Sequence, residues 1–240
     1  MNAPTPQYPG TNGPDQAPVL VTGANGFVGY YLVERLLQRG FPVTATGRGA
    51  CRLPFTQEAF RYRSLDFTDR LAVEELLAEE KPGAIIHSGA LSKPDECEQD
   101  RAAAFRTNVA GTQLLLEGAE QQGVPFHFLS TDFVFSGAAD SYGEEDLRDP
   151  VNYYGETKRL AEEAVMAYPH PWSIVRTVLV YGAPRQNRGN LLTVVANGLN
   201  EGRTLRIFTD QLRTPTYVED LAEALVRILE RKATGIYHIS

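Results

Sequence analysis

A strand pattern, a turn with three evenly spaced glycines and a helix pattern follow one another near the start of the chain. Residues 18–22 form a short apolar run that suits a buried strand, and residues 27–39 carry helical periodicity. Gly23 allows a tight turn off the strand, Gly26 lets the backbone approach a pyrophosphate, and Gly29 lets the helix pack closely on the sheet. The helix N-terminus adds N–H groups and a partial positive charge, so the order predicts a dinucleotide-binding turn. A turn that is rich in glycine for packing alone is the alternative. The residues expected to bind the cofactor here are Gly23, Asn25, Gly26, Phe27, Val28 and Gly29.

Strand and helix patterns continue to alternate along most of the chain. A second strand is expected over residues 42–46, which completes a strand–helix–strand unit of about 30 residues. Repeated alternation predicts an α/β fold, a Rossmann-type doubly wound parallel sheet covered by helices on both faces. Further strands are expected over residues 61–67, 84–88, 125–130 and 173–180, and helices over residues 69–80, 100–122 (interrupted near Gly111) and 152–168.

The pattern changes after Tyr181, where we expect a small substrate-binding lobe to begin. The expected domains are a disordered tail over residues 1–17, an NAD(P)-binding domain over residues 18–181 and a partial substrate-binding lobe over residues 182–240. The lobe is interleaved with the last strands of the sheet. Its expected elements are a polar loop (182–189), a short helix (190–199), a short strand (205–208), an amphipathic helix (218–231) and a final strand (235–239).

The composition is that of a soluble globular protein, with 42% hydrophobic and 22% charged residues and a net charge of −7. This balance argues against nucleic-acid binding, which needs a basic stripe. No apolar run approaches the ~20 residues of a membrane span, and the N-terminus lacks the features of a signal peptide. Cys51 and Cys97 make no disulfide framework and are expected to be reduced thiols of a cytoplasmic protein. The histidines show no metal-ligand spacing, so no metal is expected.

The end of the second strand decides which dinucleotide is expected. An acidic residue there binds the ribose 2′-hydroxyl of NAD, whereas an arginine suits the 2′-phosphate of NADP. The chain has Gly47 and Arg48 at this point and no carboxylate, which favours NADP and leaves NAD as the alternative. Arg48 as a solvated strand end is the other interpretation of this residue.

Tyr154 and Lys158 lie four residues apart in the helix expected over residues 152–168. This spacing puts a phenol and an ammonium on one helix face, an arrangement that can move a proton beside a nicotinamide. A lysine charge also lowers the pKa of a neighbouring tyrosine, which is otherwise a poor proton donor–acceptor at neutral pH. The spacing alone is a weak signal, and Tyr154 as a packing residue is the alternative.

The sequence resembles the extended short-chain dehydrogenase/reductase superfamily from Pro18 to nearly the end of the chain. The glycine turn TGANGFVG (residues 22–29) and the Tyr154–Lys158 pair carry this resemblance. Three further segments are similar to the dTDP-4-dehydrorhamnose reductase branch: LSTDFVFSG (129–137), RTVLVYG (176–182) and DQLRTPT (210–216). The first and third of these are the more diagnostic of the branch.

The resemblance implies hydride transfer between a nicotinamide and a sugar carbonyl. Tyr154 would donate the proton, Thr131 would bind the substrate oxygen, and Lys158 would also bond the nicotinamide ribose. Arg213, in an expected loop, is a candidate for binding a substrate phosphate or diphosphate, or else is a solvated surface residue. The catalytic set is therefore Thr131, Tyr154 and Lys158, and the substrate set is Thr131, Asp132 and Arg213.

The resemblance implies more cofactor contacts along the edge of the sheet. Asp66 and Phe67 match the segment that contacts adenine, and residues 88–90 (Ser88, Gly89 and Ala90) match the turn that runs along the cofactor. Asn108 matches an asparagine that holds the active-site geometry or a proton-relay water. Each polar residue has a structural alternative: a turn for Asp66, a hydroxyl satisfied by backbone for Ser88, and a helix-interior amide for Asn108.

The chain departs from the family pattern in two places, which bear on the expected reaction and on the substrate lobe. The related dehydratases have Asp-Glu after the catalytic threonine, whereas here Asp132 is followed by Phe133, which disfavours elimination of water. Family members usually continue past the last expected strand, but this chain stops at Ser240, so either it is cut short or its substrate lobe is unusually small.

The function that the sequence favours is an NADP-dependent reductase of a 4-keto-6-deoxy sugar nucleotide. One alternative is another enzyme of the superfamily, such as an epimerase or a reductase of a different carbonyl. A second alternative is a catalytically silent NADP-binding regulatory subunit, because the regulatory β subunit of methionine adenosyltransferase resembles this branch too. Many members of the superfamily dimerise, so a homodimer is considered, although the sequence carries no interface signal of its own.

Overall fold

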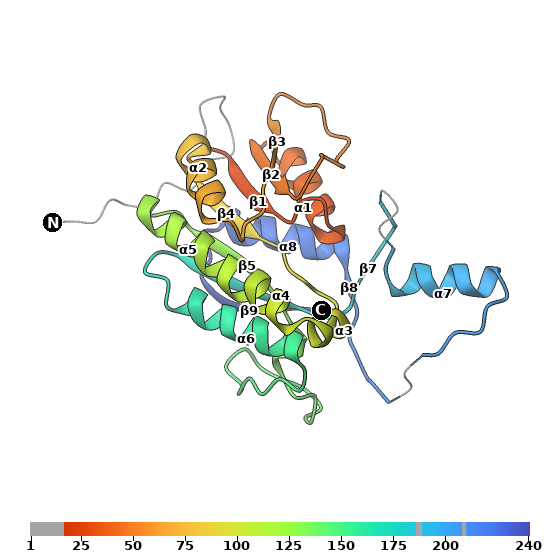
Figure 1. Ribbon diagram of the computed structural model, residues 1–240. Helices are drawn as coiled ribbons and strands as arrows, with labels where there is room; N and C mark the ends of the chain where they lie inside the picture. The colour runs from red at the N-terminus through yellow and green to blue at the C-terminus, as the bar shows by residue number, and fades with distance from the viewer. Residues whose placement is uncertain (1–16, 186–188, 208–209) are drawn as a thin grey trace.

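The computed structural model describes residues 17–185, 189–207 and 210–240, so all but the last residue of the tail expected over 1–17 lies outside the described residues. Its centre is a seven-stranded sheet in which every neighbouring pair is parallel (Figure 1). The expected doubly wound sheet is confirmed. In sheet order the strands are β3 (Phe60–Ser64), β2 (Val43–Gly47), β1 (Val19–Thr22), β4 (Ala84–His87), β5 (Phe126–Thr131), β6 (Trp172–Thr177) and β9 (Gly235–Ile239).

Helices cover both faces of the sheet. α1 (Phe27–Gln38) and α8 (Val218–Glu230) pack on one face, and α2 (Arg70–Glu80), α5 (Gly111–Gln122) and α6 (Tyr153–Met166) pack on the other. Because successive side chains of a strand point to opposite faces, β1 contributes Val19 and Val21 to the first core and Leu20 to the second. Both cores are apolar, as expected for a parallel sheet buried on both sides.

The helical stretch expected over residues 100–122 is present and is interrupted just before Gly111. Its parts are α4 (Arg101–Phe105), a π-helical turn (Arg106–Ala110) and α5. A short helix, α3 (Pro94–Gln99), precedes it and was not expected. The segment PDECEQ lacks apolar periodicity, so only its first turn, in which Pro94 is followed by two acidic residues, signals this helix.

After β6 the chain forms α7 (Leu191–Asn200) and a two-stranded parallel sheet of β7 (Val180–Tyr181) and β8 (Thr216–Tyr217). The strand expected over 173–180 therefore ends at Thr177, and Val180 pairs separately with Thr216. In Figure 1, α7 projects away from the main sheet and its helices. No helix in the described part of the chain has the length and apolar character needed to cross a bilayer.

The strand expected over residues 205–208 is wrong for residues 205–207, which have no strand structure, and Phe208 lies outside the described residues. The Arg203 N–H bonds to the Gly198 carbonyl (2.8 Å), which turns the chain back along α7. Leu205 then packs on Gly198, where a Cβ would stand 2.8 Å from the leucine Cδ2. Leu205 thus packs on a helix instead of pairing with a strand.

Candidate active site

The glycine turn lies where the strand order reverses, between β1 and β4, which is the usual ligand position in open α/β sheets. Gly23 has φ +70°, and a Cβ there would lie 2.7 Å from Gly89 Cα. A Cβ on Gly26 or Gly29 would lie 2.9 or 2.3 Å from the Gly23 carbonyl oxygen. Gly26 caps α1 without a side chain, and the first turn of α1 holds no acidic residue. The turn therefore fits a dinucleotide phosphate, which the helix N-terminus would receive.

Asn25 fastens the loop after β2 to this turn. Its amide donates to the Ala50 carbonyl (3.1 Å) and the Tyr62 hydroxyl (2.8 Å), and its oxygen accepts from the Arg52 N–H (3.0 Å). Tyr62 in turn donates to the carbonyls of residues 47 and 49. The loop that carries Arg48 is thereby fixed beside the glycine turn. The sequence did not reveal Tyr62 or Arg52, because neither lies near Asn25 in the chain.

The two residues expected near adenine have different environments. The Asp66 carboxylate accepts from the Thr68 N–H (3.0 Å) and hydroxyl (2.8 Å), which ends the strand expected over 61–67 early, at Ser64. Burial raises the Asp66 pKa, but the Thr68 hydrogen bonds and the charges of Arg48 and Arg106 lower it overall. This edge of the sheet therefore carries positive charge from both arginines.

Phe67 packs inward. A Cβ on Gly89 or Gly111 would lie 2.6 or 2.7 Å from atoms of the Phe67 ring, which therefore fits between these two glycines. The ring also meets the His87 ring edge-on, with centroids 5.1 Å apart. The two glycines thus leave room for the ring that supports the turn after β4, and Asp66 is the more exposed member of the pair.

The turn after β4 is bonded into the protein. The Ser88 hydroxyl donates to the Thr22 carbonyl (2.7 Å). This bond corresponds to the structural alternative for Ser88, a hydroxyl that is satisfied by the backbone. Asn108, in the π-helical turn, accepts from the Leu91 N–H (2.8 Å) and donates to the Leu91 carbonyl (3.0 Å) and the Thr157 hydroxyl (2.9 Å). Asn108 therefore joins the turn that holds Gly89 and Ala90 to the helix that carries Tyr154.

α6 brings the expected catalytic pair, Tyr154 and Lys158, to the end of β5. Its first turn lies close to the 3₁₀ turn Asp132–Val134, because a Cβ on Gly155 would stand 2.1 Å from the Phe133 carbonyl oxygen. Tyr154 is buried, and its phenol lies near the Thr131 hydroxyl. Burial raises the pKa of Tyr154, and the Thr131 hydroxyl opposes that shift. The phenol is therefore protonated at neutral pH, as a proton donor must be.

Lys158 lies one turn further along the same face of α6. It is 3% exposed; its Nζ donates to the Leu129 carbonyl (2.8 Å) and lies 3.8 Å from the centroid of the Phe128 ring. Burial lowers the pKa of Lys158 to about 7, and the charge of Glu162 opposes this shift. The charged ammonium and the neutral amine of Lys158 are therefore both populated near pH 7.

Arg213 and Asp132 lie together beside this pair. Arg213 Nη1 donates to Asp132 Oδ2 (2.9 Å), and the guanidinium lies 4.6 Å from the centroid of the Phe133 ring. Phe133 meets Tyr154 edge-on at 5.8 Å. Burial raises the pKa of Asp132, and Arg213 and Thr131 oppose that shift. The structure therefore gathers the whole expected substrate set around the phenol of Tyr154.

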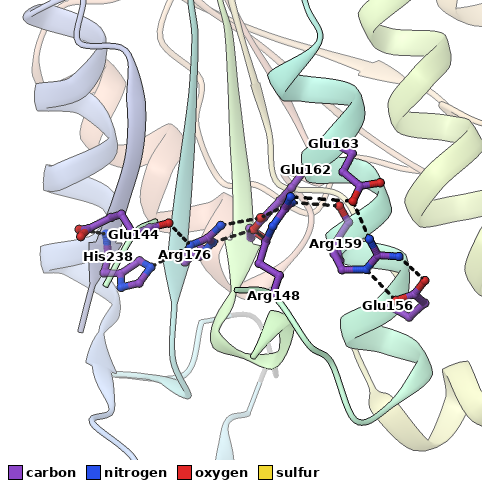
Figure 2. Close-up of polar contacts among 9 residues, drawn as sticks. Glu144, Arg148, Glu156, Arg159, Glu162, Glu163, Arg176 and His238 are labelled. Carbon is purple, nitrogen blue, oxygen red and sulfur yellow. Dashed lines mark hydrogen bonds and ion pairs between the residues drawn. The ribbon is translucent and has the colours of Figure 1, made fainter. Parts of the chain in front are cut away.

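A buried charged network next to the expected catalytic pair was not predicted from the sequence. Glu162 on α6 accepts from Arg176 on β6 through Nε (3.0 Å) and Nη2 (2.8 Å), and from Arg148 (3.2 Å) (Figure 2). Arg176 also donates to the Glu144 carbonyl (2.9 Å) and bonds His238 Nε2 (3.1 Å). The sequence did contain a signal for Glu162: it lies four residues after Lys158, a spacing that places both residues on one helix face.

The fold, the glycine turn and the Tyr154–Lys158 pair define an NAD(P)-dependent oxidoreductase of the extended short-chain dehydrogenase/reductase type. A family model described as the RmlD substrate binding domain matches residues 17–240, and the chain belongs to this family. The expected branch is thereby confirmed.

Relatives of known name are similar over most of the chain. A dTDP-4-dehydrorhamnose reductase of Streptomyces griseus is 34% identical over 226 residues, which are 91% of this chain and 69% of the relative. The methionine adenosyltransferase 2 subunit beta of Xenopus laevis is 29% identical over 227 residues, 92% of this chain and 66% of the relative. The chain therefore spans about two thirds of the length of these proteins.

Solved structures give the same likeness. A dTDP-4-dehydrorhamnose reductase of Bacillus anthracis in complex with NADP has a TM-score of 0.78 at 27% identity, over 93% of this chain and 74% of that one. A UDP-glucose 4-epimerase of Thermus thermophilus in complex with NAD has a TM-score of 0.79 at 28% identity, over 92% and 77%. Both chains share the fold with this protein.

Proposed function

We propose that the protein is a sugar-nucleotide reductase that uses NADPH to reduce the 4-keto group of a 6-deoxy sugar nucleotide. The observation that carries this proposal is the grouping of Thr131, Tyr154 and Lys158 at the end of β5, on the same sheet edge as the glycine turn. The names of similar proteins, reductases of dTDP-linked keto sugars among them, support the substrate class.

In this mechanism the bound nicotinamide supplies the hydride, and the residues of the chain position the carbonyl and move the proton. Thr131 orients the carbonyl oxygen, and Tyr154 gives it a proton as negative charge develops there. The high pKa of Tyr154 keeps the proton in place until that charge appears. Lys158 then favours the phenolate that is left, because its ammonium lies on the same helix face.

The preference for NADP rests on the loop after β2. Arg48 follows the strand directly, and its charge acts on Asp66 together with that of Arg106. The bonds of Asn25 hold this loop beside the helix N-terminus that would receive the pyrophosphate. An arginine at this position suits a 2′-phosphate.

Reduction is favoured over elimination of water by the residues beside Thr131. Phe133 takes the place of the second carboxylate, and Asp132 is paired with Arg213. Two alternatives stay open: an epimerase, which needs the same catalytic residues, and a regulatory subunit, to which the similarity with the Xenopus laevis subunit points. The cytoplasmic location and the homodimer stay predictions.

The test is the oxidation of NADPH, followed by its absorbance, with a dTDP-4-keto-6-deoxy sugar. Tyr154→Phe should lower kcat by at least about 100-fold, the usual contribution of a positioned proton donor, and leave NADPH affinity within a few-fold. Tyr153→Phe is the matched control. The Tyr153 ring stacks on Arg101, and we expect this variant to keep its activity. Retained activity in Tyr154→Phe would remove that residue as the donor.

The same assay separates the alternatives. Interconversion of sugar isomers without net use of cofactor would indicate an epimerase. Binding of NADP without turnover, together with a stable protein partner, would indicate a regulatory subunit.

A further inference from the structure

The last three residues of β5 each contact one residue on a single face of α6. Those helix residues are spaced by four, so they lie one above another along the helix. Two of them are the expected catalytic pair, and the third was not part of the expected site. The contacts join the Thr131 hydroxyl to Tyr154, the Leu129 carbonyl to Lys158 Nζ (2.8 Å), and the Ser130 hydroxyl to Glu162 Oε1 (2.5 Å).

Glu162 is a fully buried acidic residue. A carboxylate in such a place is retained only if its oxygens are paired. Oε1 accepts from Ser130 and Arg176 Nε, and Oε2 accepts from Arg176 Nη2 and Arg148 Nη1. Arg148 and Arg176 therefore help to fix its side chain (Figure 2), and Glu162 follows Lys158 by four residues on the same face of α6.

Few charges are positioned to act on the buried Lys158. On α6 the neighbours along the face are Tyr154 and Glu162. From β4, His87 faces it as a neutral ring, since burial and the lysine charge lower the His87 pKa to about 3. From β6, Arg176 reaches this region but is paired with Glu162. Burial alone disfavours the ammonium, and Glu162 supplies the charge that opposes burial.

We propose that Glu162 is a positioning residue for the catalytic pair: it keeps Lys158 charged and, through Ser130, fixes the strand end that presents Thr131. The catalytic consequence rests on the proposed function. The electrostatic effect on Lys158 does not, and it can be measured without a substrate.

The direct test is the titration of Lys158 by NMR in protein labelled at the lysine side chains. The chain has four lysines (Lys81, Lys93, Lys158 and Lys232), and Lys158→Arg assigns the signal. In Glu162→Gln we expect the midpoint of Lys158 to fall by about one pH unit, as for the loss of one charge in a partly screened site. Glu156→Gln is the matched control: it makes the same change on the same helix, but Glu156 pairs with Arg159 on another face. An unchanged midpoint in folded Glu162→Gln would overturn the proposal.

Arg148→Met is a second variant, for the case in which Glu162→Gln does not fold. It should shift the Lys158 midpoint in the opposite direction. Arg148 is 21% exposed, and its removal takes a positive charge away from the network. The Lys158 midpoint should rise by a few tenths of a unit. A fall or no change would overturn the proposal, because it would show that the charges of this network do not act on Lys158.

Activity gives the second readout. The pKa of Lys158 is about 7. If Glu162→Gln lowers it by about one unit, the protonated fraction of Lys158 at pH 7 falls about fivefold. The kcat of Glu162→Gln at pH 7 should fall by the same factor and recover as the pH is lowered toward 6. A loss of kcat that is equal at both pH values would indicate structural damage only and would count against the proposal. Wild-type protein without activity on any sugar nucleotide would refute the proposed function, while the NMR titration would still decide the role of Glu162.

Discussion

We expect Arg176→Met to destabilise the fold far more than the loss of an ordinary ion pair. The Arg176 side chain is 2% exposed and its partner Glu162 is 0% exposed. Methionine of similar length leaves the carboxylate with Ser130 and the partly exposed Arg148, and leaves the Glu144 carbonyl without its donor. Removing one partner of a buried pair costs about 3–5 kcal/mol. In a chain of this size each kcal/mol corresponds to about 2–4 °C, so the melting temperature should fall by about 6–20 °C.

Thermal and urea unfolding, followed by circular dichroism, measure this loss. Arg70→Met is the control, since the Arg70–Glu117 pair is exposed (55% and 51%) and should cost at most about 1 kcal/mol. The double variant Glu162→Leu/Arg176→Met should be more stable than Arg176→Met, because it no longer buries a carboxylate that has lost its main partner. A loss in Arg176→Met no larger than in the control would refute this reasoning, as would a double variant that loses the sum of two large single effects.

Two further predictions concern the cofactor and pH. Arg48→Asp should move the ratio of kcat/KM for NADPH and NADH toward NADH by at least about tenfold, because a carboxylate binds a ribose hydroxyl and repels a 2′-phosphate; an unchanged ratio would show that Arg48 does not contact it. Burial lowers the pKa of His87 to about 3, with the charge of Lys158 adding to it, and that of His127 to about 4. Both rings are thus neutral when folded but take up protons near pH 6.5 when unfolded, so stability is full above pH 6.5 and is lost as the pH falls. The loss at pH 5 should be about 3–4 kcal/mol by urea unfolding, and His127→Asn should roughly halve it; an equal loss in that variant would exclude His127.

The sequence predicted those parts of the fold that depend on local pattern. The glycine turn, the alternation of strands and helices and the spacing of Tyr154 and Lys158 are all readable within a few turns of chain. One helix that was missed and one strand that was wrongly predicted have physical explanations. α3 is short and polar, so it has no apolar period, and the segment after α7 packs on Gly198, a contact that propensity does not encode.

The contacts that complete the site join distant parts of the chain. Asn25 and Tyr62 are 37 residues apart, Asp132 and Arg213 are 81 apart, and Asn108 and Thr157 are 49 apart. Such pairs depend on the order of strands in the sheet, which a single sequence does not specify. Glu162 is the exception, since its place on the face of Tyr154 and Lys158 could have been seen from spacing alone.

The contacts between β5 and α6 also have a consequence for how the chain can vary. The end of β5 itself determines how α6 is positioned along it. The length of the loop between them is therefore not needed to set this position. Its outer part, residues 138–141, can change in length or composition at little entropic cost, provided that Glu144 and Arg148 keep their partners. The residues of the proposed site and the outer part of this loop can therefore change independently of each other.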